Sequence, residues 1–177
     1  MRSGWARMGV VAFAALLIAG CGQLYGAPAE EAAAPAATSA PTAADGRAFL
    51  ERNARADGVV TLPSGLQYKV ERSGPPDGPN PTMGDEVKVH YEGTLVDGTV
   101  FDSSYQAGQP AVFTVGQLVK GFDEALMRMR PGDVWYIYMP PELGYGDRNA
   151  GPIPPGSVLV FKLEMLGVLP RSTGAMG

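Results

Sequence analysis

Alternating apolar and polar residues mark strands in the second half of the chain. From residue 87 to residue 92 the odd positions hold Val, Val and Tyr, and the even positions hold Lys, His and Glu. This period of two is that of a half-buried strand. Residues 134–139 alternate in the same way, and a last apolar strand is predicted over residues 158–167. Asp97-Gly98 fits a tight hairpin turn after the first of these strands.

A single segment within the same region has a good helical period. Apolar residues recur at the spacing of one helix face from Phe122 to Met129, which predicts a helix over residues 119–129. Pro131-Gly132 ends it. Many strands and one central helix indicate an α+β fold, in which an antiparallel sheet forms a half-barrel wrapped around that short helix.

A short apolar run near the amino terminus follows two basic residues. Arg2 and Arg7 precede 13 residues, Met8 to Gly20, that are apolar or small. A membrane-spanning helix needs about 20 such residues, whereas this length after a basic start is typical of a secretory signal peptide. We therefore expect residues 1–20 to be a signal peptide.

The apolar run ends in Leu17-Ile18-Ala19-Gly20-Cys21, which resembles a bacterial lipobox. The resemblance implies cleavage before Cys21, a lipid on its sulfur and an acylated new amino terminus. Several acyl chains anchor a protein firmly where one chain is marginal. Gly22, in place of an acidic residue, favours the outer membrane, with the protein facing the periplasm. The alternative is a plain signal peptide with an incidental cysteine.

The composition changes after this cysteine. Residues 27–44 hold 10 Ala and 3 Pro among 18 positions, which gives too little apolar surface to offset the entropy of ordering the segment. Asp45 is expected to cap a short helix that ends near Ala56. We predict five segments: a signal peptide (1–20), a tether (21–44), a short helix and connection (45–60), the folded domain (61–169) and a flexible tail (170–177).

Charge and cysteine content exclude several classes of function. The net charge is −4, and it becomes −6 without Arg2 and Arg7, because 12 basic residues then face 18 acidic ones. That balance offers no basic stripe for nucleic acid. One cysteine cannot form an internal disulfide, and one histidine cannot supply a zinc cluster. We expect no metal and no cofactor.

Aromatic and aliphatic residues gather around one carboxylate in a recognisable order. The chain reads VHYEG at 89–93, FDSS at 101–104, VKGF at 119–122, YG at 145–146, and IPPG at 153–156 ahead of VLVF at 158–161. Such a set suits a concave pocket that holds its ligand by shape and desolvation. The series resembles the FKBP-type peptidyl-prolyl cis-trans isomerases from Leu62 to Leu169. The preceding junction resembles that of Mip-like members, whose long dimerisation helices do not fit here, so we expect a monomer.

The resemblance implies which residues form the site. The catalytic positions of the family fall on Tyr91, Phe101, Asp102, Tyr145 and Phe161, and its substrate contacts fall on Leu118, Val119, Phe122 and Ile153. The Tyr145 hydroxyl and the Ile153 backbone N–H would donate hydrogen bonds to the bound peptide, and Phe122 would lie beneath the proline ring.

Four further positions qualify that picture. Phe113 and Trp135 are expected in the core beneath the pocket. Phe122 departs from the family, which most often has Trp there, so contact with proline and with macrolide inhibitors should be looser. Ala111 takes a place that is aromatic in some relatives, which predicts a pocket more open on that side.

The expected activity needs no covalent step. Rotation about a peptide bond faces a barrier of about 18–20 kcal/mol, because twisting destroys amide resonance, and X-Pro bonds therefore interconvert slowly. A catalyst must bind the twisted amide better than either planar form. The sequence thus predicts a lipid-anchored isomerase acting on X-Pro bonds of exported proteins. The alternatives are a binding module or chaperone for proline-containing segments and a purely structural envelope lipoprotein.

The residues present do not support a hydrolase triad, a glycosidase site or a phosphate-binding loop. His90 with Asp102 and Ser103 or Ser104 suggests a hydrolase triad, yet His90 lies on the strand face opposite Tyr91. Asp123-Glu124 is expected to be a solvated helix start, not the carboxylate pair of a glycosidase. The glycines between residues 144 and 156 lack the Gly-Lys-Ser/Thr of a phosphate loop.

Overall fold

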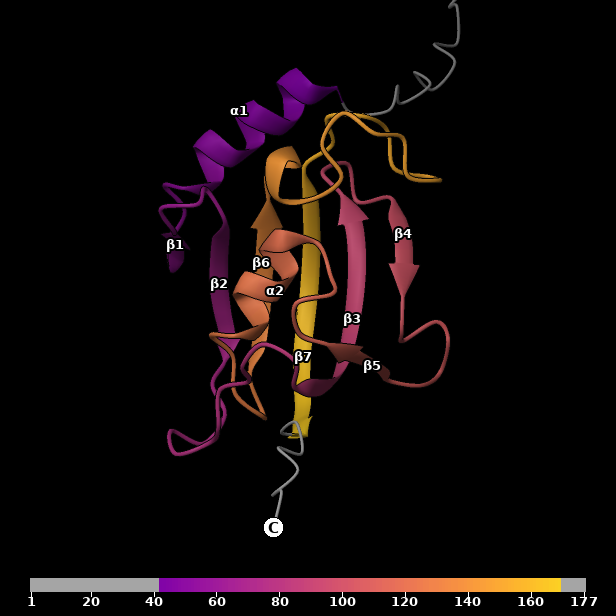
Figure 1. The fold of residues 1–177 in the computed structure, drawn as a ribbon. Helices are drawn as coiled ribbons and strands as arrows, with labels where there is room; N and C mark the ends of the chain where they lie inside the picture. Colours follow the sequence, from indigo (N-terminus) through magenta and orange to yellow (C-terminus); the bar gives the residue numbers. More distant parts are fainter. Residues whose placement is uncertain (1–41, 170–177) are drawn as a thin grey trace, which may run out of the picture. The chain divides into compact units, whose positions relative to one another are not determined.

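A computed structural model describes residues 42–169 of the chain (Figure 1). The elements in this part are α1 (Ala43–Asn53), β1 (Val59–Thr61), β2 (Gln67–Arg72), β3 (Glu86–Leu95), β4 (Val100–Ser103), β5 (Ala111–Thr114), α2 (Lys120–Leu126), β6 (Val134–Met139), the 3₁₀ helix η1 (Pro141–Leu143) and β7 (Leu159–Leu169). The predicted signal peptide, Cys21, most of the tether and the tail lie outside the described residues. Among residues 42–169, no helix is both long and apolar enough to cross a membrane.

The seven strands of this part form one sheet in which every pairing is antiparallel. The strand order is β1-β2-β6-β7-β3-β4, and β5 pairs with β3 as well. Helix α2 lies against one face of the sheet (Figure 1), and its Phe122, Ala125 and Leu126 are buried in the core. The prediction of an α+β fold with an antiparallel sheet around one short helix is confirmed.

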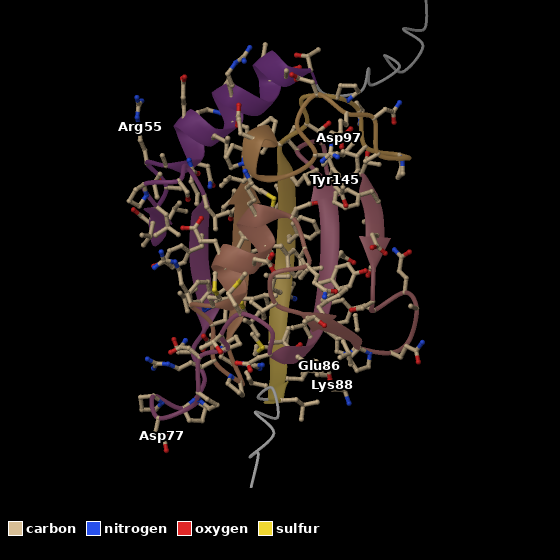
Figure 2. All side chains as sticks on the ribbon, viewed as in Figure 1. Arg55, Asp77, Glu86, Lys88, Asp97 and Tyr145 are labelled. Atoms are coloured by element: carbon tan, nitrogen blue, oxygen red, sulfur yellow. The ribbon has the colours of Figure 1, made fainter. Side chains whose placement is uncertain are left out.

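The central strand β3 follows the predicted alternation. Val87 and Val89 are fully buried, whereas Lys88 is exposed and His90 is half-buried. The hairpin from β3 to β4 turns at Gly98, whose φ of 87° lies in the region that favours glycine. Figure 2 shows that Tyr145 lies near one end of the sheet, with Glu86 and Lys88 at the other end.

Helix α1 begins earlier than predicted. Its N-cap is Thr42, whose hydroxyl accepts the Asp45 N–H while the Asp45 carboxylate accepts the Thr42 N–H at 2.9 Å. This is a capping box, in which the acidic residue is the third helical position and not the cap. The prediction of Asp45 as the cap was therefore wrong, and the helix ends at Asn53, short of Ala56.

Helix α2 is shorter than its apolar period indicated. It covers residues 120–126, and the chain continues through a turn in which the Met129 N–H donates to the carbonyls of both Ala125 and Leu126. Met129 is still fully buried. The Met129 side chain faces the same core as those of α2, so the apolar residues keep their helical spacing through the turn although the backbone there is no longer α-helical.

Candidate functional site

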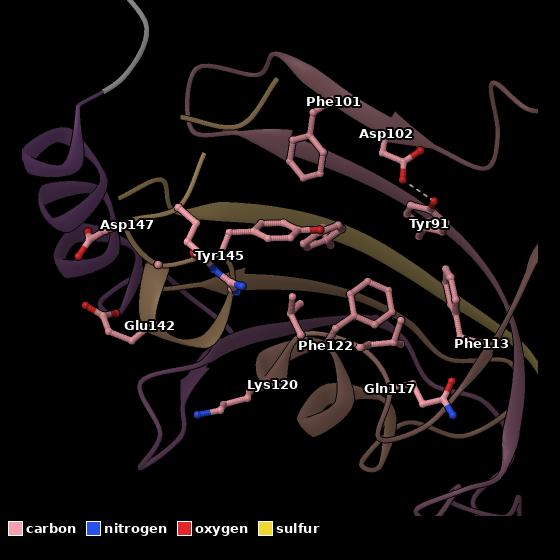
Figure 3. A pocket seen from close by; sticks show the side chains of 16 residues that line it. Tyr91, Phe101, Asp102, Phe113, Gln117, Lys120, Phe122, Glu142, Tyr145 and Asp147 are labelled. Carbon is pink, nitrogen blue, oxygen red and sulfur yellow. Dashed lines mark hydrogen bonds between the residues drawn. The ribbon is translucent and has the colours of Figure 1, made fainter. Parts of the chain in front are cut away.

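A cavity of about 760 Å³ opens between α2, β3, β4 and the segment that follows η1 (Figure 3). We call it the main pocket, and its lining residues are Tyr91, Phe101, Asp102, Phe113, Gln117, Leu118, Val119, Lys120, Phe122, Glu142, Gly144, Tyr145, Gly146, Asp147, Arg148 and Phe161. Eight of the nine side chains that the sequence assigned to the site are in this set. Ile153 is the exception.

The apolar part of the main pocket is built from rings that meet edge to face. The Phe122 ring is 5.2 Å from that of Phe161 at an interplanar angle of 88°, and 6.2 Å from that of Tyr91 at 87°. Phe101 meets Phe161 at 5.5 Å. Edge-to-face contacts of this kind are favourable beyond the area they bury. Phe122 is 5% exposed, so it forms the base of the pocket while its neighbours form the walls.

A close approach of backbone to rings makes these walls possible. Gly93 lies in β3 behind Phe101 and Phe161, and a Cβ atom there would be 2.6 Å from the Phe101 ring and 2.7 Å from the Phe161 ring. Glycine is thus required at this position by space, because any side chain would displace both walls.

The carboxylate of the pocket is bound by a tyrosine. The Tyr91 hydroxyl donates to Asp102 Oδ2 at 2.6 Å (Figure 3). Burial, and then the hydrogen bond to this carboxylate, raise the pKa of Tyr91 to about 12. The phenol therefore keeps its proton at neutral pH, and Asp102 accepts from it as an anion, which makes a short, strong hydrogen bond.

The loop before α2 is held by a buried carboxylate. Asp123 is 9% exposed and accepts the backbone N–H groups of Gly116 at 2.8 Å and Leu118 at 3.3 Å. These bonds place Leu118 and Val119 at the pocket. The expectation of a solvated helix start was wrong for Asp123, because its side chain turns back to satisfy the loop instead of pointing to water.

Tyr145 reaches the main pocket from the segment after η1. Backbone hydrogen bonds hold this segment in place. The Gly146 N–H donates to the Pro141 carbonyl at 2.8 Å, and the Gly156 N–H donates to the Gly146 carbonyl at 2.9 Å. The Arg148 side chain donates to the Tyr145 carbonyl at 3.3 Å. Tyr145 is half-buried and lines the main pocket.

The structure does not bring Ile153 to the main pocket. The Ile153 backbone N–H donates to the Ala150 carbonyl at 3.2 Å, and the Ala150 N–H donates back to the Ile153 carbonyl at 3.1 Å. The side chain is 4% exposed and packs in the core. The predicted donor is thus engaged in a tight turn of its own loop, with Gly151 at a φ of 62°.

Phe113 was expected in the core, and this was wrong. It is half-buried and lines the main pocket, where its ring is 5.8 Å from that of Phe122. It pairs with Val87 in the sheet, so it faces the same side as Tyr91. Trp135 is 7% exposed and lies in the core as expected.

Sequence reasoning also missed the polar residues that line the main pocket besides Asp102 and Tyr145, namely Gln117, Lys120, Glu142, Asp147 and Arg148. No motif marks these residues; only the spatial proximity of α2 and η1 gathers them. A second cavity of about 160 Å³ lies beyond Tyr91 and Asp102, beside Pro110 and Ala111. It is on the side where the small Ala111 predicted a more open pocket.

The geometry does not form a hydrolase triad. His90 Nδ1 lies 3.0 Å from Ser104 Oγ, but the Asp102 carboxylate is bonded to Tyr91 and orients no histidine. The His90 ring stacks instead on Tyr105, with a centroid distance of 4.6 Å. Ser104 bonds the backbone of Tyr91 instead.

Comparison with known proteins agrees with the architecture. The family model described as FKBP-type peptidyl-prolyl cis-trans isomerase matches residues 78–166. The model of the domain amino terminal to FKBP-type peptidyl-prolyl isomerase matches residues 21–70.

Among similar sequences, "Peptidyl-prolyl cis-trans isomerase Mip" of Coxiella burnetii is 53% identical over 123 residues, which are 69% of this chain and 53% of that protein. "Outer membrane protein MIP" of Legionella longbeachae is 48% identical over 126 residues, 71% of this chain and 53% of that protein. The chain therefore spans about half the length of these curated relatives.

Solved structures show the same fold. FkpA from Escherichia coli has a TM-score of 0.69 at 40% identity and covers 72% of this chain and 59% of its own. A peptidyl-prolyl cis-trans isomerase from Pseudomonas syringae has a TM-score of 0.66 at 34% identity, and the match covers 75% of this chain and 98% of the other. By its fold, its sequence and the order of its pocket residues, this chain belongs to the FKBP-type peptidyl-prolyl cis-trans isomerase family.

Proposed function

We propose that this protein is a peptidyl-prolyl cis-trans isomerase that accelerates rotation of X-Pro bonds in exported proteins. The observation that carries the proposal is the main pocket itself. Its base and walls are aromatic, its carboxylate is paired with a phenol, and its lining residues include no serine, threonine, cysteine or histidine. Such a site can bind and desolvate a peptide segment, which is what this non-covalent reaction requires.

The roles follow from what the reacting amide needs. Twisting the X-Pro bond removes resonance, so the carbonyl becomes less polar and its hydration less valuable. Walls of Tyr91, Phe101 and Phe161 around that carbonyl exclude water and so favour the twisted form over the planar ones. Phe122 supports the proline ring from below. The Tyr145 hydroxyl, on a residue that lines the pocket, donates to a backbone carbonyl of the peptide and fixes its path across the pocket.

The test is an isomerisation assay on the full chain in detergent, with a short peptide that carries one X-Pro bond. We expect acceleration at micromolar protein over the uncatalysed reaction, which takes about 10–100 s at 25 °C. Replacing Phe122 by Trp should lower KM about 2- to 5-fold, because a larger ring buries more of the proline. Phe49→Trp is the matched control and should leave KM unchanged. Phe49 lies in α1, and its ring contacts Tyr138 and not the main pocket. A rate equal to the uncatalysed one would reject the enzyme.

A second candidate function is a module that binds proline-containing segments with little catalysis. Phe122 favours it, because the family's larger ring is missing from the base of the pocket. Peptide affinity measured together with turnover separates the two functions. Micromolar binding without acceleration supports the module, and binding with acceleration supports the isomerase.

We also propose that Cys21 carries a lipid anchor that holds the protein in the bacterial cell envelope, in the outer membrane and facing the periplasm. The sequence before Cys21 supports this proposal, as does the relative named outer membrane protein. In a Gram-negative host, Cys21→Ser should move the protein out of the membrane fraction and remove the acyl chains from its measured mass. Ser39→Ala, within the tether, is the control. A Cys21→Ser protein that stays in the membrane fraction would contradict the anchor.

A further inference from the structure

The central strand has a gap in its pairing at the main pocket. On the side of β4 and β5, β3 pairs with β5 over Glu86–Val89 and with β4 over Glu92–Thr94. Between these ranges, His90 and Tyr91 have no strand partner on that side. The backbone N–H and C=O of Tyr91 must therefore be satisfied by another group, since buried backbone polar groups are almost always paired.

One residue fills the gap. The Ser104 backbone N–H donates to the Tyr91 carbonyl at 3.0 Å. The Ser104 Oγ accepts the Tyr91 N–H at 2.8 Å and lies 3.1 Å from the Tyr91 carbonyl oxygen. Ser104 is 4% exposed and follows Asp102 by two residues. It therefore holds the main chain of Tyr91 against the same segment that carries the acceptor of the Tyr91 hydroxyl.

His90 competes for the hydrogen of this serine. A hydroxyl donates one hydrogen and accepts two, and Ser104 Oγ lies between the Tyr91 carbonyl and His90 Nδ1, which is 3.0 Å away. When Nδ1 carries no proton, the Tyr91 carbonyl and Nδ1 are both acceptors, and the hydroxyl hydrogen of Ser104 can bond only one of them at a time. When the imidazole is doubly protonated, Nδ1–H must donate to Oγ, and the hydroxyl hydrogen is left for the Tyr91 carbonyl.

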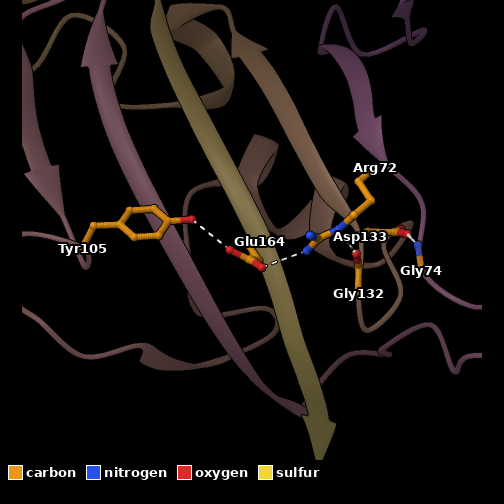
Figure 4. A network of polar contacts seen from close by, with 6 residues as sticks. All are labelled: Arg72, Gly74, Tyr105, Gly132, Asp133 and Glu164. Atoms are coloured by element: carbon orange, nitrogen blue, oxygen red, sulfur yellow. Dashed lines mark hydrogen bonds and ion pairs between the residues drawn. The ribbon is translucent and has the colours of Figure 1, made fainter.

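Charged groups of both signs surround the His90 ring. Glu164 lies directly opposite on β7, where it accepts from Arg72 at 2.8 Å and from the Tyr105 hydroxyl at 3.2 Å (Figure 4). Tyr105 also stacks on the imidazole. Other charged residues on the same face of the sheet are Glu86, Lys88 and Glu92 on β3, Lys162 on β7 and Lys69 on β2. Ser104, in contrast, contacts both the His90 ring and the backbone of Tyr91.

We propose that Ser104 and His90 are positioning residues for Tyr91, and that protonation of His90 tightens the hold of Ser104 on the Tyr91 backbone. This inference rests on the proposed isomerase function of the same pocket. The Tyr91 side chain forms a wall of the main pocket and donates to Asp102. Stronger hydrogen bonding of Ser104 to the Tyr91 backbone therefore stabilises the geometry that binds the twisted amide. Activity then depends on pH through the only histidine of the chain.

The first test is the pH profile of kcat/KM for the full chain, with a peptide that has no ionisable side chain. Histidine is the side chain that titrates between pH 5 and 8. We expect kcat/KM to be about 2- to 5-fold higher at pH 5 than at pH 8, the effect of one modest hydrogen bond. His90→Phe keeps a ring to stack on Tyr105 and should make the profile flat. A flat wild-type profile, or the same step in His90→Phe, would overturn the proposal.

The serine is tested by a matched pair. Ser104→Ala should lower kcat/KM about tenfold, because it leaves the Tyr91 N–H unpaired, and it should abolish the pH step. Ser104→Thr keeps the hydroxyl and should restore both. The neighbouring Ser103 bonds Glu92 and the Gln106 N–H instead of Tyr91, so Ser103→Ala should keep the wild-type rate and step. Equal effects of the two alanine variants would count against a specific role for Ser104.

A readout without turnover separates this inference from the proposed function. The amide signal of Tyr91 in an NMR titration of the full chain should move between pH 5 and 8 in the wild type, move much less in Ser104→Ala, which keeps the adjacent His90, and stay fixed in His90→Phe. If the protein shows no isomerisation, the proposed function fails, and this titration still decides the link between His90 and Tyr91. A Tyr91 amide that does not titrate, or that titrates equally in Ser104→Ala, rejects the link.

Discussion

Replacing Gly93 by alanine is expected to lower kcat/KM for a proline peptide by about 10- to 100-fold, the loss that a displacement of about 1 Å at a reacting site can cause. The new Cβ would lie 2.6 Å from the Phe101 ring and 2.7 Å from the Phe161 ring. Both rings are walls of the main pocket and meet each other edge to face. Neither can move without narrowing the space for the amide carbonyl, so the substitution should act on binding and rate together.

Stability and a second glycine distinguish this effect from a general defect. Overpacking of this kind costs about 1–3 kcal/mol of the free energy of unfolding, which urea denaturation would measure. Gly167, in β7 of the same sheet, has open space around an added Cβ, so Gly167→Ala should change neither stability nor rate by much. A Gly93→Ala protein with wild-type kcat/KM would mean that these two rings do not bound the reacting amide.

The second large effect is expected at the carboxylate of the pocket. Asp102→Asn should lower kcat/KM about tenfold, because a charge-assisted hydrogen bond from the Tyr91 hydroxyl becomes a weaker neutral one. Tyr91→Phe should cause a similar loss, and the double variant should be little worse than either, as for groups that act as a unit. Asp77→Asn makes the same charge change on a distant loop (Figure 2) and is the control. Additive losses would show that the two side chains act independently.

The titration of Tyr91 gives an independent measure of the same pair. The pKa of Tyr91 is about 12, raised first by burial and second by the hydrogen bond to Asp102. In Asp102→Asn it should fall but stay above 10, because burial is unchanged; NMR of the tyrosine ring carbons would follow it. Since the folded pKa lies above the unfolded value of 10, the contribution to stability is complete below pH 10 and is lost as the pH rises to 12.

Periodicity predicted the elements of this domain better than their ends. Alternation located β3 and β6 and the buried side of each, because the period of a strand fixes which residues face the core. The end of α2 was misplaced because Met129 keeps the helical spacing in a turn that is not α-helical. The start of α1 was misplaced because Thr42 and Asp45 are both good capping residues, and only the reciprocal hydrogen bonds decide between them.

The candidate site was predicted through the order of its motifs, and local hydrogen bonds explain why some residues lie elsewhere than expected. Ile153 was assigned to the pocket, but a tight turn with Ala150 engages its N–H. Asp123 lies in the first turn of α2, where acidic side chains usually meet water, yet it bonds the loop before the helix. Phe113 follows the strand alternation correctly. Whether that face meets the core or a cavity depends on α2, which the alternation of β5 does not reveal.

The pairing of β3 with β7 has a consequence for how the protein is made. His90 and Glu164 are partners in the sheet although 74 positions separate them in the chain. The rings that bound the main pocket come from both strands, with Tyr91 on one and Phe161 on the other. Non-local pairing of this kind slows folding. Because the chain is synthesised from its amino terminus, β3 cannot pair with β7 until residues 159–169 have been made. The main pocket therefore cannot be complete before residues 159–169 have been synthesised.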